Sequence, residues 1–269
     1  MIVSIWTFII MIVSAFLCVA MPFAAFFFGK DREKRKFSIF LWGMVFFIAS
    51  ILIQALIWSL FGMDSVIKHL LGTDPSVATI AAVIKETFAV AVETAVIYLA
   101  CRLFMKKDSN SVRPLRFAGG YAFADSLTVM IMLILSVVGV FISLKGGDYR
   151  FEISKGVTVA ADTIGKSQIW QYLFKVLVRL LNLIIYSVSA FFIYTGYHYD
   201  AKWLYFMAFL VHLCLDLPYD MCSLETVWYW RSTVFTSVVM FLVAAIAVVI
   251  AIFTYRNYYK KNKRESVRG

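Results

Sequence analysis

The sequence predicts an all-α protein, a polytopic membrane bundle of about seven transmembrane helices, and three observations lead to this fold class. Of the 269 residues, 62% are hydrophobic and only 16% are charged, and the mean hydropathy is +0.83. Soluble domains are nearer one-half apolar and one-quarter charged, so this composition leaves no sizeable soluble domain. The apolar residues form seven long runs, and basic residues gather at the ends of these runs. A run of about 20 apolar residues has the length of a transmembrane helix.

Each expected span is an apolar run bounded by a polar segment. The first run ends at the charged segment 30–36, and it lacks the basic leader and cleavage site of a signal peptide, so we expect a retained span. The third run is long enough to cross a membrane although it contains Lys85, Glu86 and Glu93. The longest polar connection, 145–168, is expected to be a surface loop with room for a short interfacial helix. The spans are expected at residues 2–29, 37–62, 77–105, 117–144, 170–197, 203–221 and 228–255.

Residues 1–255 are expected to form one transmembrane domain, followed by a basic, disordered tail at 256–269. A net charge of +10 is compatible with nucleic-acid binding, but the charges lie between apolar runs and no soluble basic module exists. We therefore expect the lipid bilayer, and no nucleic acid, as a partner. The four cysteines lie in or beside apolar runs without metal-ligand spacing, which predicts that they pack as small apolar side chains.

The distribution of lysine and arginine predicts the orientation of the chain. Seven spans place the two termini on opposite sides of the membrane. The tail and the loops on its side carry 16 Lys and Arg residues, whereas the loops on the other side carry six. The positive-inside rule then places the amino terminus outside and the tail in the cytoplasm. This pattern predicts a multi-pass protein of the cell membrane, of the kind found in the bacterial plasma membrane.

Narrow lines of polar residues run along four of the expected spans at helical spacing. Residues three, four or seven apart share a helix face, and a polar face within an apolar span is expected to point into the bundle. The four lines consist of Glu86 and Glu93; of Tyr121, Asp125 and Thr128; of Lys175, Arg179, Asn182 and Tyr186; and of Tyr205, His212, Asp216 and Tyr219.

The line in the sixth span is the most informative, because His212 and Asp216 lie one turn apart in the middle of an apolar run. Pro218 is expected to break the helix that follows. An unpaired charge in this setting costs several kcal/mol, so we expect Arg179 to pair with Asp216 or with Glu86. Packing or helix register is sufficient to explain any one polar residue, and Lys175 is expected to reach the interface by snorkelling.

Three ionisable groups at similar depth are harder to explain by packing alone. Glu93, His212 and Asp216 together therefore favour a functional site.

Four short motifs occur in an order and at a spacing similar to those of the YhfC-type intramembrane metalloproteases. This family is related to the CAAX-protease and bacteriocin-processing superfamily. His-Leu-Cys-Leu-Asp-Leu-Pro at 212–218 is similar to the family's His-x-x-x-Asp/Asn-x-Pro pattern. Arg179 followed by Tyr186 resembles its Arg-x6-His stretch. Val-Glu-Thr at 92–94 resembles its Glu-Glu-Thr motif, and Gly-Tyr-Ala-Phe-Ala-Asp at 120–125 resembles its Gly-His-Gly-x-x-Glu motif. The resemblance implies an intramembrane-protease fold over nearly the whole chain.

The departures from the family pattern fall on the chemistry. Tyr121 and Tyr186 stand where histidines are expected, Val92 replaces a glutamate, and Asp125 is one methylene shorter than the glutamate of the motif. Catalytic zinc needs about three protein ligands and a water. The resemblance therefore leaves Glu93 as a vestigial or candidate base. It leaves His212, Asp216 and Asp125 as candidate metal ligands, and Tyr121, Tyr186, Arg179 and Glu86 as residues that line the cavity.

These departures predict a pseudoprotease that keeps the cavity, has lost the cofactor, and binds a transmembrane helix or a lipidated peptide. One alternative is an active, divergent metalloprotease that uses zinc with His212, Asp125, Asp216 and Glu93. Another is a transporter whose path follows Glu86, Glu93, Arg179 and Asp216. No phosphate-binding loop, Gly-x-Gly-x-x-Gly or Gly-x-Ser-x-Gly motif offers a competing chemistry.

Overall fold

The structure is a computed structural model of the chain and describes residues 5–24, 36–62, 75–105, 112–144, 169–223 and 232–260. All regular secondary structure within these residues is helical, as the composition predicted. The predicted loop at 145–168 lies outside the described residues. The helices are α1 (Ile5–Ala24), α2 (Lys36–Leu60), α4 (Pro75–Phe104), α5 (Val112–Leu144), α7 (Ile169–Tyr199), α8 (Trp203–Ser223), α9 (Thr233–Tyr255) and the short π-helix η2 (Arg256–Lys260).

The apolar helices make the chain a multi-pass helical membrane protein. Within the described residues α1 has only a shorter apolar stretch, Ile9–Ala24. α4 carries Lys85, Glu86 and Glu93 in its interior, and it does not meet the same apolar criterion. The five segments that are long and apolar enough to cross a membrane are Phe37–Leu60, Val112–Leu135, Tyr172–Tyr199, Trp203–Cys222 and Thr233–Tyr259. The count of seven spans therefore stays a prediction.

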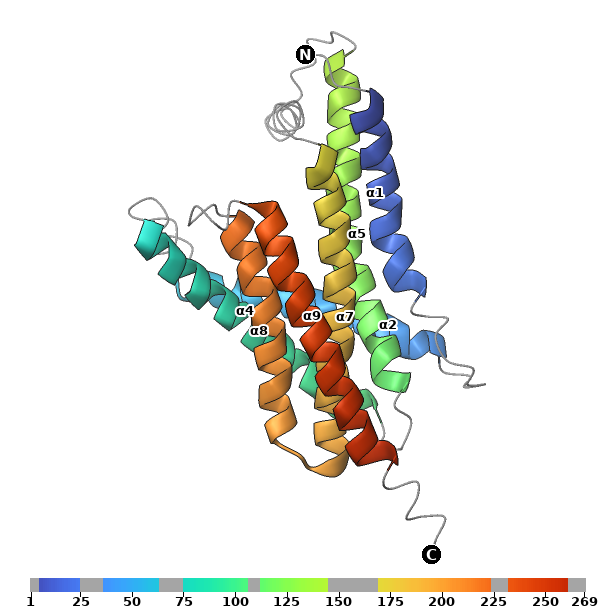
Figure 1. Cartoon of the computed structure of the whole chain (residues 1–269), viewed down its shortest axis with the longest axis vertical. Coiled ribbons are helices and arrows are strands. Elements are labelled where there is room, and N and C mark those ends of the chain that lie inside the picture. Colours follow the sequence, from blue (N-terminus) through green and yellow to red (C-terminus); the bar gives the residue numbers. More distant parts are fainter. Residues whose placement is uncertain are drawn as a thin grey trace, which may run out of the picture.

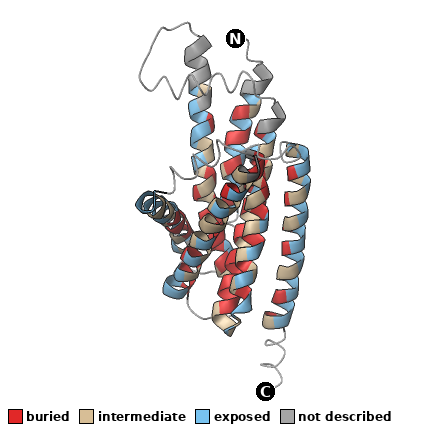
Figure 2. Cartoon of the chain, turned by 90° about the vertical axis from the view of Figure 1, so that its left-hand side faces the viewer, coloured by how far each residue is buried: buried red, intermediate tan, exposed pale blue. Residues whose placement is uncertain are grey.

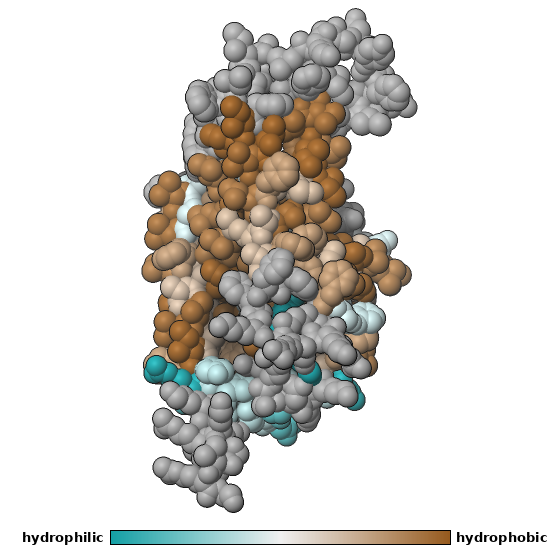
Figure 3. Space-filling model, turned by 90° about the vertical axis from the view of Figure 1, so that its right-hand side faces the viewer, coloured by the Kyte–Doolittle hydropathy of each residue, from teal (hydrophilic) through white to brown (hydrophobic). Residues whose placement is uncertain are grey.

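The surface agrees with a lipid environment. Large apolar side chains such as Phe206, Phe241 and Met132 are more than half exposed, which water would disfavour and hydrocarbon would not. Figure 3 shows apolar residues over most of one described face, with hydrophilic residues gathered toward its lower end.

The long helix α7 organises the bundle. α5 lies beside α7 along the long axis, α1 packs against both at one end, and α8 and α9 pack against α7 at the other (Figure 1). α2 and α4 cross this array obliquely. Figure 2 shows the buried residues concentrated along the middle of the bundle, where fully buried Phe192 and Tyr194 of α7 lie in the main core. A smaller core of Met11, Ala15, Leu133 and Tyr172 joins α1, α5 and α7.

Two glycines allow α2 and α5 to cross with their backbones in contact. A Cβ atom added to Gly43 would lie 2.1 Å from the carbonyl oxygen of Phe117, and one added to Gly120 would lie 1.9 Å from that of Phe40. Small residues at a helix crossing permit this close approach, which membrane proteins use widely. The crossing places Tyr121, which follows Gly120, directly against α2.

The expected helix break at Pro218 is wrong, because α8 continues through it to Ser223. Proline removes one backbone hydrogen bond, but neighbouring helices in a membrane bundle make such a loss tolerable. Here α8 is packed against α4, α7 and α9. As a result Asp220 remains on the helix, one turn beyond Asp216.

The first residues of the predicted disordered tail are also helical, since η2 continues α9 to Lys260. Tyr259 is buried and packs its ring against Phe191 and Tyr199, with ring centroids 5.9 and 5.4 Å away. The indole Nε1 of Trp203 donates to the Tyr258 hydroxyl at 3.4 Å. Aromatic contacts therefore extend the folded domain beyond residue 255, and residues 261–269 lie outside the described part of the chain.

Candidate functional site

The polar lines of four helices meet inside the bundle around His212 of α8. The imidazole is only 1% exposed, and Tyr186 of α7 packs edge-on against it with ring centroids 5.1 Å apart. Tyr121 of α5 in turn packs against Tyr186, with ring centroids 4.9 Å apart. Tyr121 and Tyr186 thus lie in contact with each other, and Tyr186 also contacts His212.

Two carboxylates approach the same nitrogen of His212. Nε2 lies 3.0 Å from Oδ2 of Asp216, which the i,i+4 spacing on α8 places on the same face, and 3.4 Å from Oε2 of Glu93 on α4. Neither contact has the alignment of a hydrogen bond, and each becomes an ion pair when His212 is protonated. One connected cluster therefore forms inside the bundle. We call it the polar centre, and it consists of Glu93, Tyr121, Tyr186, His212 and Asp216.

Helix α2 supplies two residues of this region that the sequence did not single out. The Gln54 side-chain amide donates to Oε1 of Glu93 at 3.4 Å, and the Ser50 hydroxyl lies 2.9 Å from that of Tyr121. Ser50 is fully buried. The available signal was their spacing, because these two polar residues lie four apart in an otherwise apolar run and so share a face.

The expected pairing of Arg179 with Asp216 or Glu86 is wrong, since its partner is Asp125 of α5. Asn182, one turn along α7 from Arg179, donates to the same Asp125 oxygen at 3.3 Å. The packing of α5 against α7 brings these three residues to one level, whereas Asp216 faces His212 on its own helix. A charge this deeply buried needs a partner, and the arrangement supplies one.

A second charged cluster lies nearer the start of α4. Lys85 Nζ contacts Oδ1 of Asp220 at 2.9 Å and Oε1 of Glu86 at 3.5 Å. Glu86 therefore lies beside the polar centre rather than lining it with the tyrosines. The sequence analysis did not single out Asp220, because Pro218 was expected to break the turn in which it lies. Lys175 is exposed and lies over the ring of Tyr172, 5.8 Å from its centroid, which fits the expected snorkelling.

Several buried polar atoms of the polar centre have no hydrogen-bond partner among the described residues. They include both ring nitrogens of His212, Oε2 of Glu93 and the hydroxyl of Thr94. Thr94 also lines a cavity of about 450 Å³ between α4 and α8, together with Tyr98, Tyr205 and Phe209. Unsatisfied polar atoms beside a cavity are places where ordered water is stable. The cavity accommodates water or a small ligand, and Thr94, which follows Glu93 on α4, is the residue of its lining next to the polar centre in sequence.

The donor set does not fit the zinc ion that the family resemblance implies. Within the described ranges, no group of three or more His, Cys, Asp or Glu side chains is arranged to hold a metal ion. Asp125 is held by Arg179 and Asn182, and His212 is the only imidazole of the centre. Structural and catalytic zinc sites draw on several imidazoles, thiolates or carboxylates at one point. The tyrosines supply none of these three classes of ligand.

Comparison with known proteins adds no relative. A scan against protein-family models, a search of curated proteins and a search of solved structures each found no match to this chain.

Proposed function

We propose that this membrane protein is a catalytically inactive relative of the YhfC-type intramembrane metalloproteases, which uses the inherited bundle to bind a membrane-embedded partner. The observation that carries the proposal is the contact among Tyr121, Tyr186, His212 and Glu93. These residues lie on four different helices and far apart in sequence, yet they occupy matching positions of four family motifs. Unrelated polar residues would have little reason to meet at one point.

The chemistry of the polar centre favours inactivity. A hydrolytic metal site needs ligands that leave one position open for an activated water. Here two phenols occupy the places of imidazoles, and the carboxylates approach the one remaining imidazole. The result is a set of ion pairs and aromatic contacts that joins four helices.

The partner is expected in the cavity between α4 and α8, next to Thr94 and Phe209. A transmembrane helix or the lipid of a lipidated peptide would meet mainly apolar and aromatic side chains there. A photoreactive amino acid at Phe209 is expected to capture this partner in membranes. The same amino acid at exposed Phe241 of α9 is the control and is expected not to capture it.

Metal analysis of the purified protein tests the inactive assignment. We expect no stoichiometric zinc in the wild-type protein, and about one equivalent in the double variant Tyr121→His with Tyr186→His, because three imidazoles then converge. Adding His212→Ala to the double variant should abolish the gain. Zinc held by the wild-type protein and lost in His212→Ala would overturn the proposal. A folded double variant without zinc would contradict the proposed relation to the family.

A second function, proton or ion transfer across the membrane, is favoured by one observation. Two groups of charged residues lie along the facing helices α4 and α8. Lys85, which is partly exposed, contacts Asp220 and Glu86, and His212 contacts Asp216 and Glu93. Ionisable residues inside a membrane commonly mark such paths.

Flux measurements test this second function. When the protein is reconstituted into liposomes that contain a pH dye, a membrane potential should acidify the liposome interior. Glu93→Gln should abolish this change in dye signal. Lys175→Gln, outside the line of charges, is the matched control and should leave it unchanged. A wild-type protein without flux excludes this function.

A further inference from the structure

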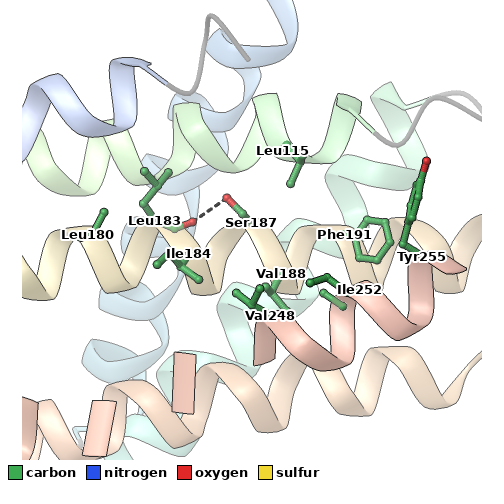
Figure 4. Close-up of a pocket in the computed structure, with 11 residues that line it drawn as sticks. Leu115, Leu180, Leu183, Ile184, Ser187, Val188, Phe191, Val248, Ile252 and Tyr255 are labelled. Atoms are coloured by element: carbon green, nitrogen blue, oxygen red, sulfur yellow. Dashed lines mark hydrogen bonds between the residues drawn. The ribbon is translucent and has the colours of Figure 1, made fainter. Parts of the chain in front are cut away.

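An apolar groove of about 620 Å³ lies among the described helices, and none of its lining residues belongs to the polar centre. Figure 4 shows α7 as its floor, with α5 and α9 as its walls. α5 and α9 each pack against α7 but make no extensive contact with each other, which leaves the groove open. Its lining includes Leu115 of α5, Leu180 and Phe191 of α7, and Ala251, Ile252 and Tyr255 of α9.

The lining accepts hydrocarbon and offers almost nothing to a polar ligand. Apart from Tyr255 at one end, Ser187 is its only polar residue, and its hydroxyl donates to the Leu183 carbonyl at 2.7 Å (Figure 4). Leu115 and Ile252 on the two walls are 37% and 50% exposed, so the groove opens outward, toward lipid. Its volume lies within the range of about 300–1,000 Å³ that is typical of ligand pockets.

The length of the groove matches one leaflet of a bilayer. Leu180 and Phe191 mark its extent along α7, and a helical rise of 1.5 Å per residue makes this about 16 Å. The hydrocarbon core of a bilayer is about 30 Å thick, so the groove covers roughly one half of it. A transmembrane helix would need contact through the full depth, whereas a single acyl chain needs only this half.

The mouth of the groove carries positive charge. Leu115 lies near the start of α5 and Tyr255 ends α9, so both walls end on the side where the tail leaves the bundle. Exposed Arg256 follows Tyr255 directly, and Arg113 begins the opposite wall two residues before Leu115. The segment 256–269 carries six Lys and Arg residues and one Glu. Tyrosine is favoured at the level of lipid headgroups, and basic clusters there attract anionic lipids.

We propose that the groove formed by α5, α7 and α9 binds one acyl chain of an anionic phospholipid, whose phosphate lies at Arg256. The apolar lining, the single-leaflet length and the basic mouth each match one part of such a lipid. The site lies apart from the polar centre and does not depend on the function proposed for it.

Native mass spectrometry of the full chain in detergent tests this site. The protein is incubated with equal amounts of phosphatidylglycerol and phosphatidylcholine that carry the same acyl chains. The protein should retain several-fold more phosphatidylglycerol than phosphatidylcholine. Ala251→Trp, which fills the groove, should lower retention of both lipids several-fold, whereas Ala245→Trp on the exposed face of α9 should not.

The headgroup contact is tested separately. Arg256→Gln should reduce retention of phosphatidylglycerol to that of phosphatidylcholine, and Lys202→Gln, an exposed cation of the link between α7 and α8, should leave the preference intact. The smaller replacement Ala251→Leu gives the same test if the tryptophan variant does not fold. Equal retention of the two lipids by the wild-type protein would overturn the proposal. So would unchanged retention in both Ala251 variants, or a copurifying polypeptide that Ala251→Trp displaces.

Discussion

Arg179 shows how a buried charge is accommodated in this bundle. Its guanidinium donates to Asp125, and Asn182 donates to the same carboxylate, so the anion has two donors from one face of α7. Removing one partner of a buried pair leaves an uncompensated charge, whereas replacing both with apolar groups is often nearly neutral. Removing one partner of the pair should therefore lower the free energy of unfolding much more than replacing both partners with apolar residues. This difference can be measured.

We expect Arg179→Ala to lower the free energy of unfolding by about 3–5 kcal/mol, because Asp125 is left charged and buried. The double variant Arg179→Met with Asp125→Leu should recover most of this loss. Unfolding in mixed micelles measures both values. Lys175→Met, an exposed cation one turn away, is the control and should change the free energy little. A double variant no more stable than Arg179→Ala would contradict the pairing.

Tyr121→Phe tests the hydrogen bond between α5 and α2. The Ser50 hydroxyl donates its one proton to the Phe47 carbonyl at 2.7 Å, so its oxygen accepts from Tyr121. Loss of this bond should cost about 0.5–1.5 kcal/mol of unfolding free energy. Tyr255→Phe removes a hydroxyl from an exposed ring and should have no measurable effect. An equal effect of both changes would show that the buried bond contributes nothing specific.

At the level of elements, the crossing of α2 and α5 determines which helices the polar centre joins. Gly43 and Gly120 bring the two backbones together, and Phe47 then packs edge-on against Tyr121 with ring centroids 5.1 Å apart. The same crossing lets α2 reach Glu93 through Gln54. A wider crossing would separate both contacts, so the two glycines position the site although neither belongs to it.

Gly120→Ala should therefore both destabilise the protein and disturb the polar centre. Its Cβ would collide with the Phe40 carbonyl, a backbone atom that cannot move aside alone, and overpacking of this kind costs about 1–3 kcal/mol. Unfolding in mixed micelles measures the loss, and Gly43→Ala should reproduce it. Met132→Val, on the exposed side of α5, is the control. Full stability of both alanine variants would show that the helices do not approach this closely.

At the level of the whole molecule, the described helices alternate between the two ends of the bundle. α1 begins at the end opposite to the one where α9 and η2 finish (Figure 1). The basic residues are divided unequally between the two sides, 16 against six. This asymmetry predicts a cytoplasmic tail, and the anionic lipid proposed for the groove would then lie in the cytoplasmic leaflet.

Reporter fusions measure this orientation. A fluorescent protein fused after Gly269 should fluoresce, and an alkaline phosphatase at the same position should stay inactive, because the tail remains in the cytoplasm. Replacing the five Lys and Arg residues of segment 30–36 with glutamine should weaken the bias. Replacing the four in 145–168 is the matched control and should not. An active phosphatase on the wild-type tail would reverse the predicted topology.

The sequence by itself determined the helical membrane class and most of the residues that face inward, although Thr128, predicted on an inward polar line, is exposed. Long apolar runs have one stable form in lipid, and a polar side chain at helical spacing has a strong reason to avoid hydrocarbon. These are local properties, so the lines containing Glu93, Tyr121, Tyr186 and His212 were predictable. The partners were not, because pairing depends on how helices cross and on where each polar group lies along its helix.

Only the tertiary structure decided that Arg179 meets Asp125, that α2 adds Ser50 and Gln54, and that α8 continues through Pro218 to place Asp220 beside Lys85. It likewise decided that an apolar groove remains where α5 and α9 both rest on α7. Backbone contact at two glycines and the packing of neighbours around a proline are properties of pairs of helices. No single segment of the chain contains them.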